Sequence, residues 1–413
     1  MITNTTRSLA EIQALESRHV VQTYKRQPVA FVRGEGVFLF DDEGRRYLDW
    51  LSGIGVAALG HAHRGLAAAL AEQAQELVHT SNLYFHALQG RVAERLASLS
   101  GLPRAFFCNS GTEAVEACLK FARRYWHAQG RTDRTEFVAL AHAFGGRTLG
   151  SLSVTWDEHY RAPFQPLVPG ITFVAPGDVD ALEAAVSERT AAIVAEPIQG
   201  EGGVRPLSSA FAAAIEAACK RTGTLLIADE IQCGLGRTGR PFYFQALGLT
   251  PDLVPVGKAL GAGFPVGAAL VSEPVAGALA FGDHGTTYGG NLLACRAALV
   301  VLDELEGGLM DRVRTVGQRL GAGLCELAAK HPAVREVRGA GLMWGLDLSV
   351  DAAPVVDAAR ARGLIVNRTS STVVRLLPPF VLSEVEADEG LALLDAALAD
   401  ALSPRAAGQE GGA

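Results

Sequence analysis

The sequence has little of what marks secreted, membrane-spanning or nucleic-acid-binding proteins. Its six cysteines are scattered over 413 residues without a C-x-x-C pair, which is typical of reduced thiols in a cytoplasmic protein. No apolar run approaches the roughly 18 residues of a membrane span, and the N-terminus lacks the apolar segment of a secretory signal. The net charge is −7 and basic runs are missing, so nucleic acid is not an expected partner. We predict a cytoplasmic, enzyme-sized protein.

Short apolar segments rich in Val, Ile and Phe alternate with helical patterns from about residue 65 to residue 300. The expected strands are 104–108, 136–140, 171–175, 191–198, 224–231, 252–256 and 267–272. Alternation of this kind predicts an α/β fold with a mostly parallel sheet that is covered by helices on both faces.

A chain of this length is expected to form more than one domain. Residues 31–50 predict a β-hairpin turned at Asp42-Glu43-Gly44, whereas residues 335–348 and 372–379 predict β-segments before a last helix that ends near residue 401. We predict an N-terminal segment that joins a smaller domain (1–62), a large α/β domain (63–295), a C-terminal α+β domain (296–402) and a disordered tail (403–413).

A single lysine, Lys258, lies in the middle of the apolar, glycine-rich stretch LVPVGKALGAGFPVGAALVS at residues 253–272. Lysine is rarely buried unless its charge is compensated. Either the side chain reaches solvent or its amine takes part in chemistry. Apolar surroundings would lower the pKa of the amine and make it nucleophilic.

Two glycine-rich patterns are misleading. GLGRTG (234–239) matches the dinucleotide fingerprint, but three residues separate it from the expected strand and a poor helix pattern follows it. We therefore expect a glycine-rich surface loop there and not a nicotinamide site. Gly257-Lys258 is not a P-loop, because Ala259 stands where Ser or Thr is required.

Other segments place chemically useful groups at the ends of expected strands. NSGTEA (109–114) opens a helix whose free N–H groups would bind a phosphate, although an ordinary N-cap by its hydroxyls is the alternative. LLIADEIQCG (225–234) places two acids at a strand end, where open α/β sheets bind ligands. An acid that caps a loop or pairs with an arginine is the alternative there.

Three further loops complete the set. AHAFGGRTLG (141–150) holds an aromatic ring and an arginine around two glycines, EPIQGEGG (196–203) holds two glutamates, and HGTTYGGN (284–291) holds two hydroxyls. Each loop alone is more often structural than functional. Together they supply an amine, an acid, a phosphate site and a stacking ring, which are the requirements of a pyridoxal phosphate site.

The ordered motifs resemble the class III, pyridoxal-phosphate-dependent aminotransferases, and most of all the N-acetylornithine and ornithine aminotransferases. They span about residues 24–400 and read GIGVAALGH, NSGTEA, AFGGRT, AEPIQGEGGV, ADEIQCGLGRTG, GKALGAGFP, HGTTYGGN, VRGAGLMWGLDL and VRLLPP. The resemblance implies a PLP-dependent transferase fold of type I and no metal. It also implies a homodimer with the active site at the subunit interface, and ping-pong transfer of an ω-amino group to and from glutamate.

The resemblance also implies which residues hold the cofactor. Lys258 would form the Schiff base and Asp229 would pair with the pyridine nitrogen, which makes these two the catalytic residues. The other cofactor-binding residues would be Gln232 at the ring hydroxyl, Phe144 on the ring face, and Ser110, Gly111 and Thr112 at the phosphate. Thr287 of the partner subunit would also reach the phosphate.

For the substrates, the resemblance implies two arginines. Arg147 would bind the α-carboxylate of the ω-amine substrate, and Arg375 would bind the α-carboxylate of glutamate. Glu201 would neutralise Arg375 while an ω-amine is bound. Thr286 and Tyr24 are expected to contact the substrate as well.

One loop departs from the family pattern, which is usually F-H-G-R but here is Phe144-Gly145-Gly146-Arg147. A small residue there, with GRTLGSLSVTW, is similar to relatives that act on substrates attached to an amino-group carrier protein. LSGIGVAALGH instead resembles ordinary acetylornithine enzymes, and Ile54 stands where ornithine δ-aminotransferases tend to carry tyrosine.

We therefore expect an N-acetylornithine:2-oxoglutarate 5-aminotransferase in arginine biosynthesis. Transfer on carrier-linked aminoadipate semialdehyde or lysine in lysine biosynthesis, with an acidic carrier protein as partner, is one alternative. Ornithine or another ω-amino acid is a second alternative, and a racemase or aminomutase of the same fold is a third. The acyl group or carrier on the substrate is left open by the sequence.

Overall fold

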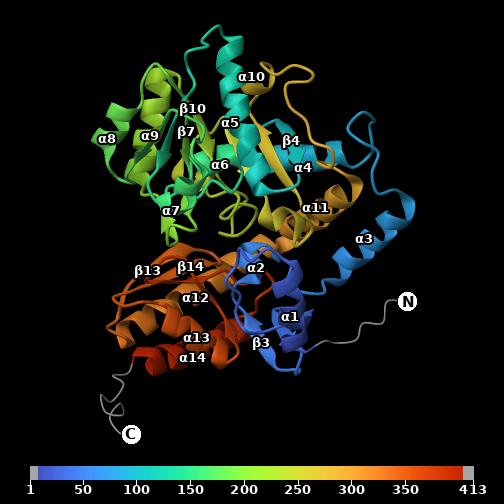
Figure 1. Ribbon diagram of the computed structural model, residues 1–413, viewed down its shortest axis with the longest axis vertical. Helices are drawn as coiled ribbons and strands as arrows, with labels where there is room; N and C mark the ends of the chain where they lie inside the picture. The colour runs from blue at the N-terminus through green and yellow to red at the C-terminus, as the bar shows by residue number, and fades with distance from the viewer. Residues whose placement is uncertain (1–7, 403–413) are drawn as a thin grey trace.

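The computed structural model describes residues 8–402, so the predicted disordered tail lies outside the described part of the chain (Figure 1). A seven-stranded sheet occupies the upper half of the molecule. Its strands, in spatial order, are β4 (Arg104–Cys108), β12 (Gly267–Val271), β11 (Leu253–Val256), β10 (Leu225–Ala228), β7 (Thr190–Ala195), β5 (Glu136–Leu140) and β6 (Ile171–Val174). Only β12 in this sheet is antiparallel to its neighbours, which confirms the predicted mostly parallel sheet.

Both faces of this sheet are buried, which explains why its strands are continuous apolar runs. Side chains alternate along a strand, and in β7 Ile193 belongs to one hydrophobic cluster while Val194 belongs to another. Helix α5 (Gly111–Ala128) contributes Phe121 to the cluster of Val194, and α9 (Ser209–Thr222) contributes Phe211 to the cluster of Ile193. The two helices therefore cover opposite faces.

The lower half of the molecule combines the two ends of the described chain (Figure 1). An antiparallel sheet in the order β13 (Val334–Ala340), β14 (Met343–Leu348), β17 (Val373–Leu376) and β16 (Asn367–Arg368) packs with α12 (Met310–Lys330), α13 (Ala353–Ala361) and α14 (Glu384–Leu402). A second sheet holds β1 (Phe31–Glu35), β2 (Phe38–Asp41), β3 (Arg46–Asp49) and β15 (Leu364–Ile365).

In that second sheet the hairpin of β2 and β3 turns at residues 42–45, as predicted, and β15 pairs parallel to β3. The N-terminal strands thus share hydrogen bonds with a segment more than 300 residues away. The division of the chain at residues 62 and 295 stays a prediction.

The remaining elements are shorter or connect these layers. They are α1 (Leu9–His19), α2 (Ser52–Gly55), α3 (Arg64–Glu76), α4 (Gln89–Ser100), α6 (Leu149–Ser153), α7 (Glu158–Arg161), η1 (Ala162–Phe164), α8 (Val179–Ala185), β8 (Ile198–Gln199), β9 (Arg205–Pro206), η2 (Phe244–Leu247), η3 (Lys258–Gly261), α10 (Glu273–Ala276), α11 (Leu292–Glu304) and the π-turn η4 (Leu305–Leu309). Within residues 8–402, no helix combines the length and apolarity that crossing a bilayer requires.

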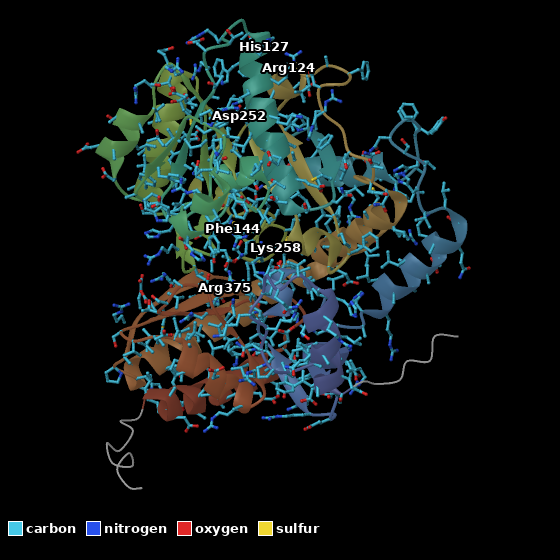
Figure 2. All side chains as sticks on the ribbon, in the orientation of Figure 1. Arg124, His127, Phe144, Asp252, Lys258 and Arg375 are labelled. Carbon is cyan, nitrogen blue, oxygen red and sulfur yellow. The ribbon has the colours of Figure 1, made fainter. Side chains whose placement is uncertain are left out.

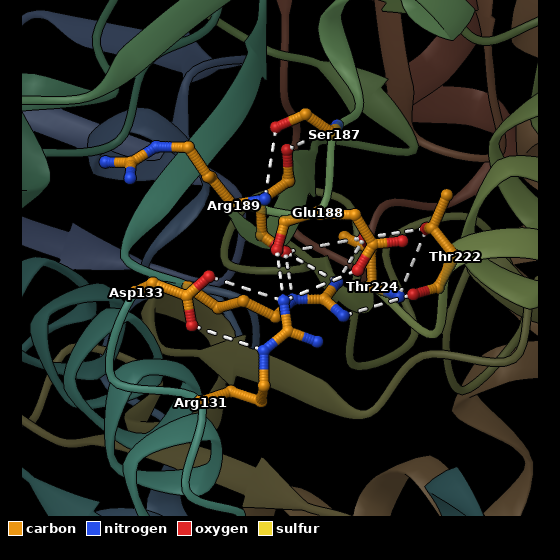
Figure 3. A network of polar contacts seen from close by, with 9 residues as sticks. Arg131, Asp133, Ser187, Glu188, Arg189, Thr222 and Thr224 are labelled. Atoms are coloured by element: carbon orange, nitrogen blue, oxygen red, sulfur yellow. Dashed lines mark hydrogen bonds and ion pairs between the residues drawn. The ribbon is translucent and has the colours of Figure 1, made fainter.

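A buried arginine, Arg134, connects the amino-terminal ends of two central strands of the large sheet. Arg134 is 2% exposed, stacks on the ring of Trp126 at 3.6 Å and donates to the main-chain carbonyl of Thr190. It also donates to the carbonyl of Thr222 and the hydroxyl of Thr224, which lie at the end of α9 and just before β10 (Figure 3). The side chain therefore connects three elements that are distant in the sequence.

The expectation of a surface loop at GLGRTG is wrong, because every residue from 234 to 239 is buried. Arg237 is fully inaccessible and donates to the carbonyls of Leu342 and Pro378. A Cβ on Gly236 would lie 2.4 Å from the side chain of Leu305. These glycines allow close packing between the two halves of the molecule, and the segment that follows them forms a single 3₁₀ turn at η2.

Candidate active site

A cavity of about 200 Å³ lies where the parallel strands end. Residues within four positions of the carboxyl ends of β10, β7, β11 and β5 enter its lining, because the carboxyl ends of parallel strands meet at one edge of a sheet. The predicted residues that it brings together are Gly111, Thr112, Phe144, Arg147, Glu201, Asp229, Gln232 and Lys258. Figure 2 shows Phe144 and Lys258 above Arg375, at the boundary between the two halves of the molecule.

Lys258 begins the short turn η3 directly after β11 and is only half-buried as a residue. Its φ of 39° lies in the left-handed region, which is sparsely populated by residues other than glycine and is often found at functional sites. Burial of the amine lowers the pKa of Lys258, and the carboxylates of Glu201 and Asp229 act in the opposite direction. Among the described residues, no carboxylate lies within ion-pair distance of this amine, so it is available for chemistry.

Two buried acids face the same cavity. Asp229 is 6% exposed and accepts the N–H of Ile231 at 3.0 Å, and burial raises the pKa of its carboxyl to about 6 although Lys258 acts to lower it. Glu196 accepts the N–H groups of Phe144 at 2.9 Å and Gly200 at 3.0 Å. Burial, with the nearby charge of Asp229, raises the pKa of Glu196 to about 8.

Sequence reasoning assigned no role to Glu196. Its carboxyl accepts the main-chain N–H of Phe144, the residue that was expected to stack on the cofactor ring, so it supports the site from within the EPIQGEGG loop. The available signal was its position directly after β7, which matches that of Asp229 directly after β10.

The N-terminus of α5 provides an anion site beside Lys258. Ser110 caps the helix by accepting the N–H of Glu113 at 3.3 Å, so the hydroxyl of NSGTEA that forms the N-cap is that of Ser110. The N–H groups of Gly111 and Thr112 lie in the first turn, where the helix itself offers no acceptor. A Cβ on Gly111 would lie 2.9 Å from the side chain of Ile231, so glycine keeps this approach open.

These groups fit pyridoxal phosphate. Two free N–H groups at the positive end of α5 suit a phosphate. The Phe144 ring suits stacking on the face of a pyridine ring, and the buried carboxyl of Asp229 suits the ring nitrogen. The amine of Lys258, without an ion-pair partner, suits a carbonyl carbon.

Arg375, on β17, is fully buried and donates from Nη1 to Glu201 Oε1 at 2.5 Å and to Gln232 Oε1 at 3.2 Å. Its Nε donates to Asn367 Oδ1 at 3.1 Å, while Nη2 has no partner among residues 8–402. Burial alone would raise the pKa of Glu201, but the charge and hydrogen bond of Arg375 outweigh it and lower that pKa. The hydroxyl of Thr369 also donates to the Glu201 main-chain carbonyl at 2.9 Å.

Arg147 has a different environment. Its side chain is exposed, and its guanidinium lies 3.8 Å from the ring centroid of Tyr160 and 4.9 Å from that of Phe144. Within the described chain no carboxylate pairs with it. A second cavity, of about 460 Å³, shares Phe144, Arg147 and Glu201 with the first and extends past Trp156 and Tyr160. Arg375 is therefore paired with a carboxylate, whereas Arg147 is not.

Besides Arg375, four predicted residues do not line this cavity: Tyr24, Ser110, Thr286 and Thr287. Tyr24 is 74% exposed and its ring lies 5.9 Å from the Arg26 guanidinium, so a single chain does not bring it to the substrate. Thr286 accepts a hydrogen bond from Asn109 at 3.3 Å, close to the start of α5, and Thr287 is exposed. Ser110 acts through its cap and does not line the cavity.

Comparisons with known proteins agree with this geometry. The family model for class-III aminotransferases matches residues 20–398. The chain is 43% identical over 382 residues to the acetylornithine aminotransferase of Methanocaldococcus jannaschii, covering 92% of this chain and 96% of that protein. It is 44% identical over 391 residues to the acetylornithine aminotransferase of Gloeobacter violaceus, covering 94% and 98%.

Solved structures agree as well. The ornithine aminotransferase of Toxoplasma gondii superposes with a TM-score of 0.92 at 31% identity and covers 97% of each chain. An amine transaminase from an uncultivated Pseudomonas species, solved in its PLP-bound form, superposes with a TM-score of 0.86 at 32% identity, covering 92% of this chain and 97% of that one.

Proposed function

The chain belongs to the class-III aminotransferases, and from this premise we propose that it transfers the ω-amino group of N-acetylornithine to 2-oxoglutarate in arginine biosynthesis. The predicted family, the type I fold and the pyridoxal phosphate cofactor are confirmed, and the protein is a pyridoxal-phosphate-dependent transaminase. The observation that carries the substrate proposal is the contrast between an unpaired Arg147 and an Arg375 that Glu201 neutralises.

Pyridoxal phosphate, when bound, supplies an electron sink and a carrier for the amino group. Asp229 would keep a proton at the ring nitrogen, and the burial of its carboxyl strengthens that interaction. The amine of Lys258 would move a proton at the substrate carbon, first as general base and then as general acid, which its lowered pKa favours. Gln232, Phe144 and the start of α5 would hold the cofactor in place.

Two substrates of different length must use the same site in turn. An ω-amine substrate would place its α-carboxylate on Arg147 while Glu201 remains on Arg375. Glutamate would instead displace Glu201 and place its α-carboxylate on Arg375. The paired state in the structure supports this exchange, because a buried guanidinium without a carboxylate is costly.

An acylated α-nitrogen also fits the charges of the site. Free ornithine carries an α-ammonium next to the carboxylate that Arg147 would bind, and like charges at close range repel. Acylation removes that charge, and the second cavity of about 460 Å³ offers room for the acyl group. These features favour N-acetylornithine over ornithine, while a carrier-linked amine stays an alternative.

The decisive assay compares kcat/KM for N-acetylornithine, free ornithine and a carrier-linked amine, each with 2-oxoglutarate as acceptor. We expect N-acetylornithine to exceed ornithine by at least about tenfold, which corresponds to about 1.4 kcal/mol. A preference for ornithine or for the carrier-linked amine would refute the proposed substrate. Borohydride reduction should fix the cofactor on Lys258, and labelling at another residue would refute the site itself.

We also propose a homodimer in which Thr287 of the partner subunit completes the phosphate site. Supporting this, large aromatic side chains are exposed in the two segments that hold Thr287 and Asn82: Phe85 and Phe281 are fully exposed, and Tyr288 is 62% exposed. The two segments are held together by Asn82, whose side chain donates to the carbonyl of Gly289 at 2.9 Å. Exposed aromatic rings are enriched at protein interfaces. A monomer in sedimentation equilibrium would contradict the proposed homodimer. The cytoplasmic location of the protein also stays a prediction.

A further inference from the structure

We infer that Tyr160 is a specificity-determining residue, which holds the guanidinium of Arg147 in the position where it binds the carboxylate of the amine substrate. This inference rests on the proposed function, because it deepens the role given to Arg147. It assigns that role to a residue of α7 that carries no sequence motif.

The first support is the contact itself. The Arg147 guanidinium lies 3.8 Å from the Tyr160 ring centroid, and the chain that the structure describes offers this arginine no carboxylate. An exposed arginine without a partner has many accessible rotamers. Contacts with the Tyr160 ring and, at 4.9 Å, with the Phe144 ring restrict them and leave the planar fork free to bind a carboxylate.

The second support is the way α7 is fastened to the loop that carries Phe144 and Arg147. The N–H of Trp156 donates to the carbonyl of Ala143 at 2.8 Å. The hydroxyl of Thr155 accepts the N–H of Gly145 at 3.0 Å. The same loop is held from the other side, where the N–H of Arg147 donates to the Thr112 hydroxyl at 3.1 Å. Tyr160 and Arg147 are therefore held by one hydrogen-bonded unit.

The third support is Gly145, at the position where this sequence departs from F-H-G-R. A Cβ on Gly145 would lie 2.5 Å from the carbonyl oxygen of Ser151 and 2.5 Å from Cγ2 of Val154. Any larger residue would have to displace α6 and the segment that leads to α7. Gly145 thus allows this segment to approach the loop closely enough for Tyr160 to reach Arg147.

Tyr160 is not simply part of the core. Its side chain is 40% exposed and it lines the second cavity, so a role limited to burial is a poor explanation for its position. Phe164, four residues further on, is 58% exposed and lies outside the lining of that cavity. Phe164→Ala is a matched control, because this substitution removes an aromatic ring from the same segment without affecting Arg147.

The test compares Tyr160→Ala, Tyr160→Phe and Phe164→Ala on two amine substrates. N-acetylputrescine is N-acetylornithine without the carboxylate, so only N-acetylornithine needs Arg147. We expect Tyr160→Ala to raise the KM for N-acetylornithine about fivefold to tenfold, as expected for loss of a cation–π contact in a partly desolvated site. The kcat and the KM for N-acetylputrescine should be unchanged, and Tyr160→Phe and Phe164→Ala should match the wild type.

An equal change for both amines in Tyr160→Ala would overturn the inference, because it would indicate a general structural defect. No change for either amine would overturn it too. If the wild type does not use N-acetylornithine, the proposed function fails, but the inference is still tested by calorimetric titration of glutarate, which needs no turnover. Glutarate carries two carboxylates, so when one lies on Arg375 the other would lie on Arg147. It should bind more weakly to Tyr160→Ala alone, and equal affinity in all three variants would reject a role for Tyr160.

Discussion

Removing the negative charge of Glu201 should make the protein less stable and, at the same time, a better binder of dicarboxylates. The substitution Glu201→Gln keeps the shape of the side chain but leaves Arg375 with the neutral acceptors Gln232 and Asn367. Arg375 is fully buried, so its charge is then poorly compensated. A carboxylate from a bound ligand would restore the compensation.

The size of the effect follows from the burial of the two partners. Breaking a fully buried ion pair costs about 3–5 kcal/mol, whereas a hydrogen bond to a charged group contributes about 1.5–3 kcal/mol. The Glu201 side chain is 34% exposed and so is partly screened by solvent, which favours the lower range. We expect the free energy of unfolding to fall by about 2 kcal/mol, and the dissociation constant for glutarate to fall by about tenfold, or 1.4 kcal/mol.

Chemical denaturation with and without glutarate measures both quantities. The matched control is Glu273→Gln, which breaks the surface pair of Arg104 and Glu273, where both side chains are at least 60% exposed. That control should change stability far less than Glu201→Gln does and leave glutarate binding unchanged. If Glu201→Gln binds glutarate more weakly than the wild type, or is no less stable than the control, Glu201 does not neutralise Arg375 in the way proposed.

Four further changes test other parts of the molecule. Asp229→Asn should retain the cofactor yet lose about 10² or more in kcat; full activity would remove its assigned role. In Glu196, a pKa raised to about 8 means that the folded state binds an extra proton above about pH 4.5, so stability of the cofactor-free protein falls as pH rises from 5 to 8. Denaturation at both pH values should show a shallower fall in Glu196→Gln, and an equal fall would contradict the cause given. Arg134→Ala should lower the free energy of unfolding by about 3 kcal/mol or more, because it leaves buried acceptors unpaired. Arg131→Ala breaks only exposed pairs and should cost much less; similar losses would contradict the burial argument. Gly145→Ala should lower the melting temperature and raise the KM for N-acetylornithine, and a wild-type KM in a folded variant would show that the segment tolerates a Cβ.

Much of the fold could be predicted because local pattern and tertiary context agree there. The strands β4, β5 and β11 are continuous apolar runs between helix patterns, and a parallel sheet buried on both faces requires that pattern. The residues at the strand ends, such as Asp229 and Lys258, could be placed at one edge for the same reason. Motif order then identified the family.

The segment 234–239 shows where this reasoning fails. Glycine and arginine are typical of surface loops, yet Arg237 and its neighbours are buried because two halves of the molecule close over them. Glu196 was missed for a related reason: its partners are main-chain N–H groups from another loop, and nothing in its own neighbourhood indicates them.

The sequence by itself determined the sheet and the family, and it indicated Lys258 and Asp229 as the candidate catalytic residues. These results depend on periodicity and on motifs that are contiguous in the chain. Only the tertiary structure decided which charges meet. Arg375 and Glu201 are 174 residues apart and form a buried pair, whereas Arg147 has two aromatic rings and no carboxylate. Such pairings depend on distances of a few ångströms between segments remote in sequence, and local sequence patterns contain no information about those distances.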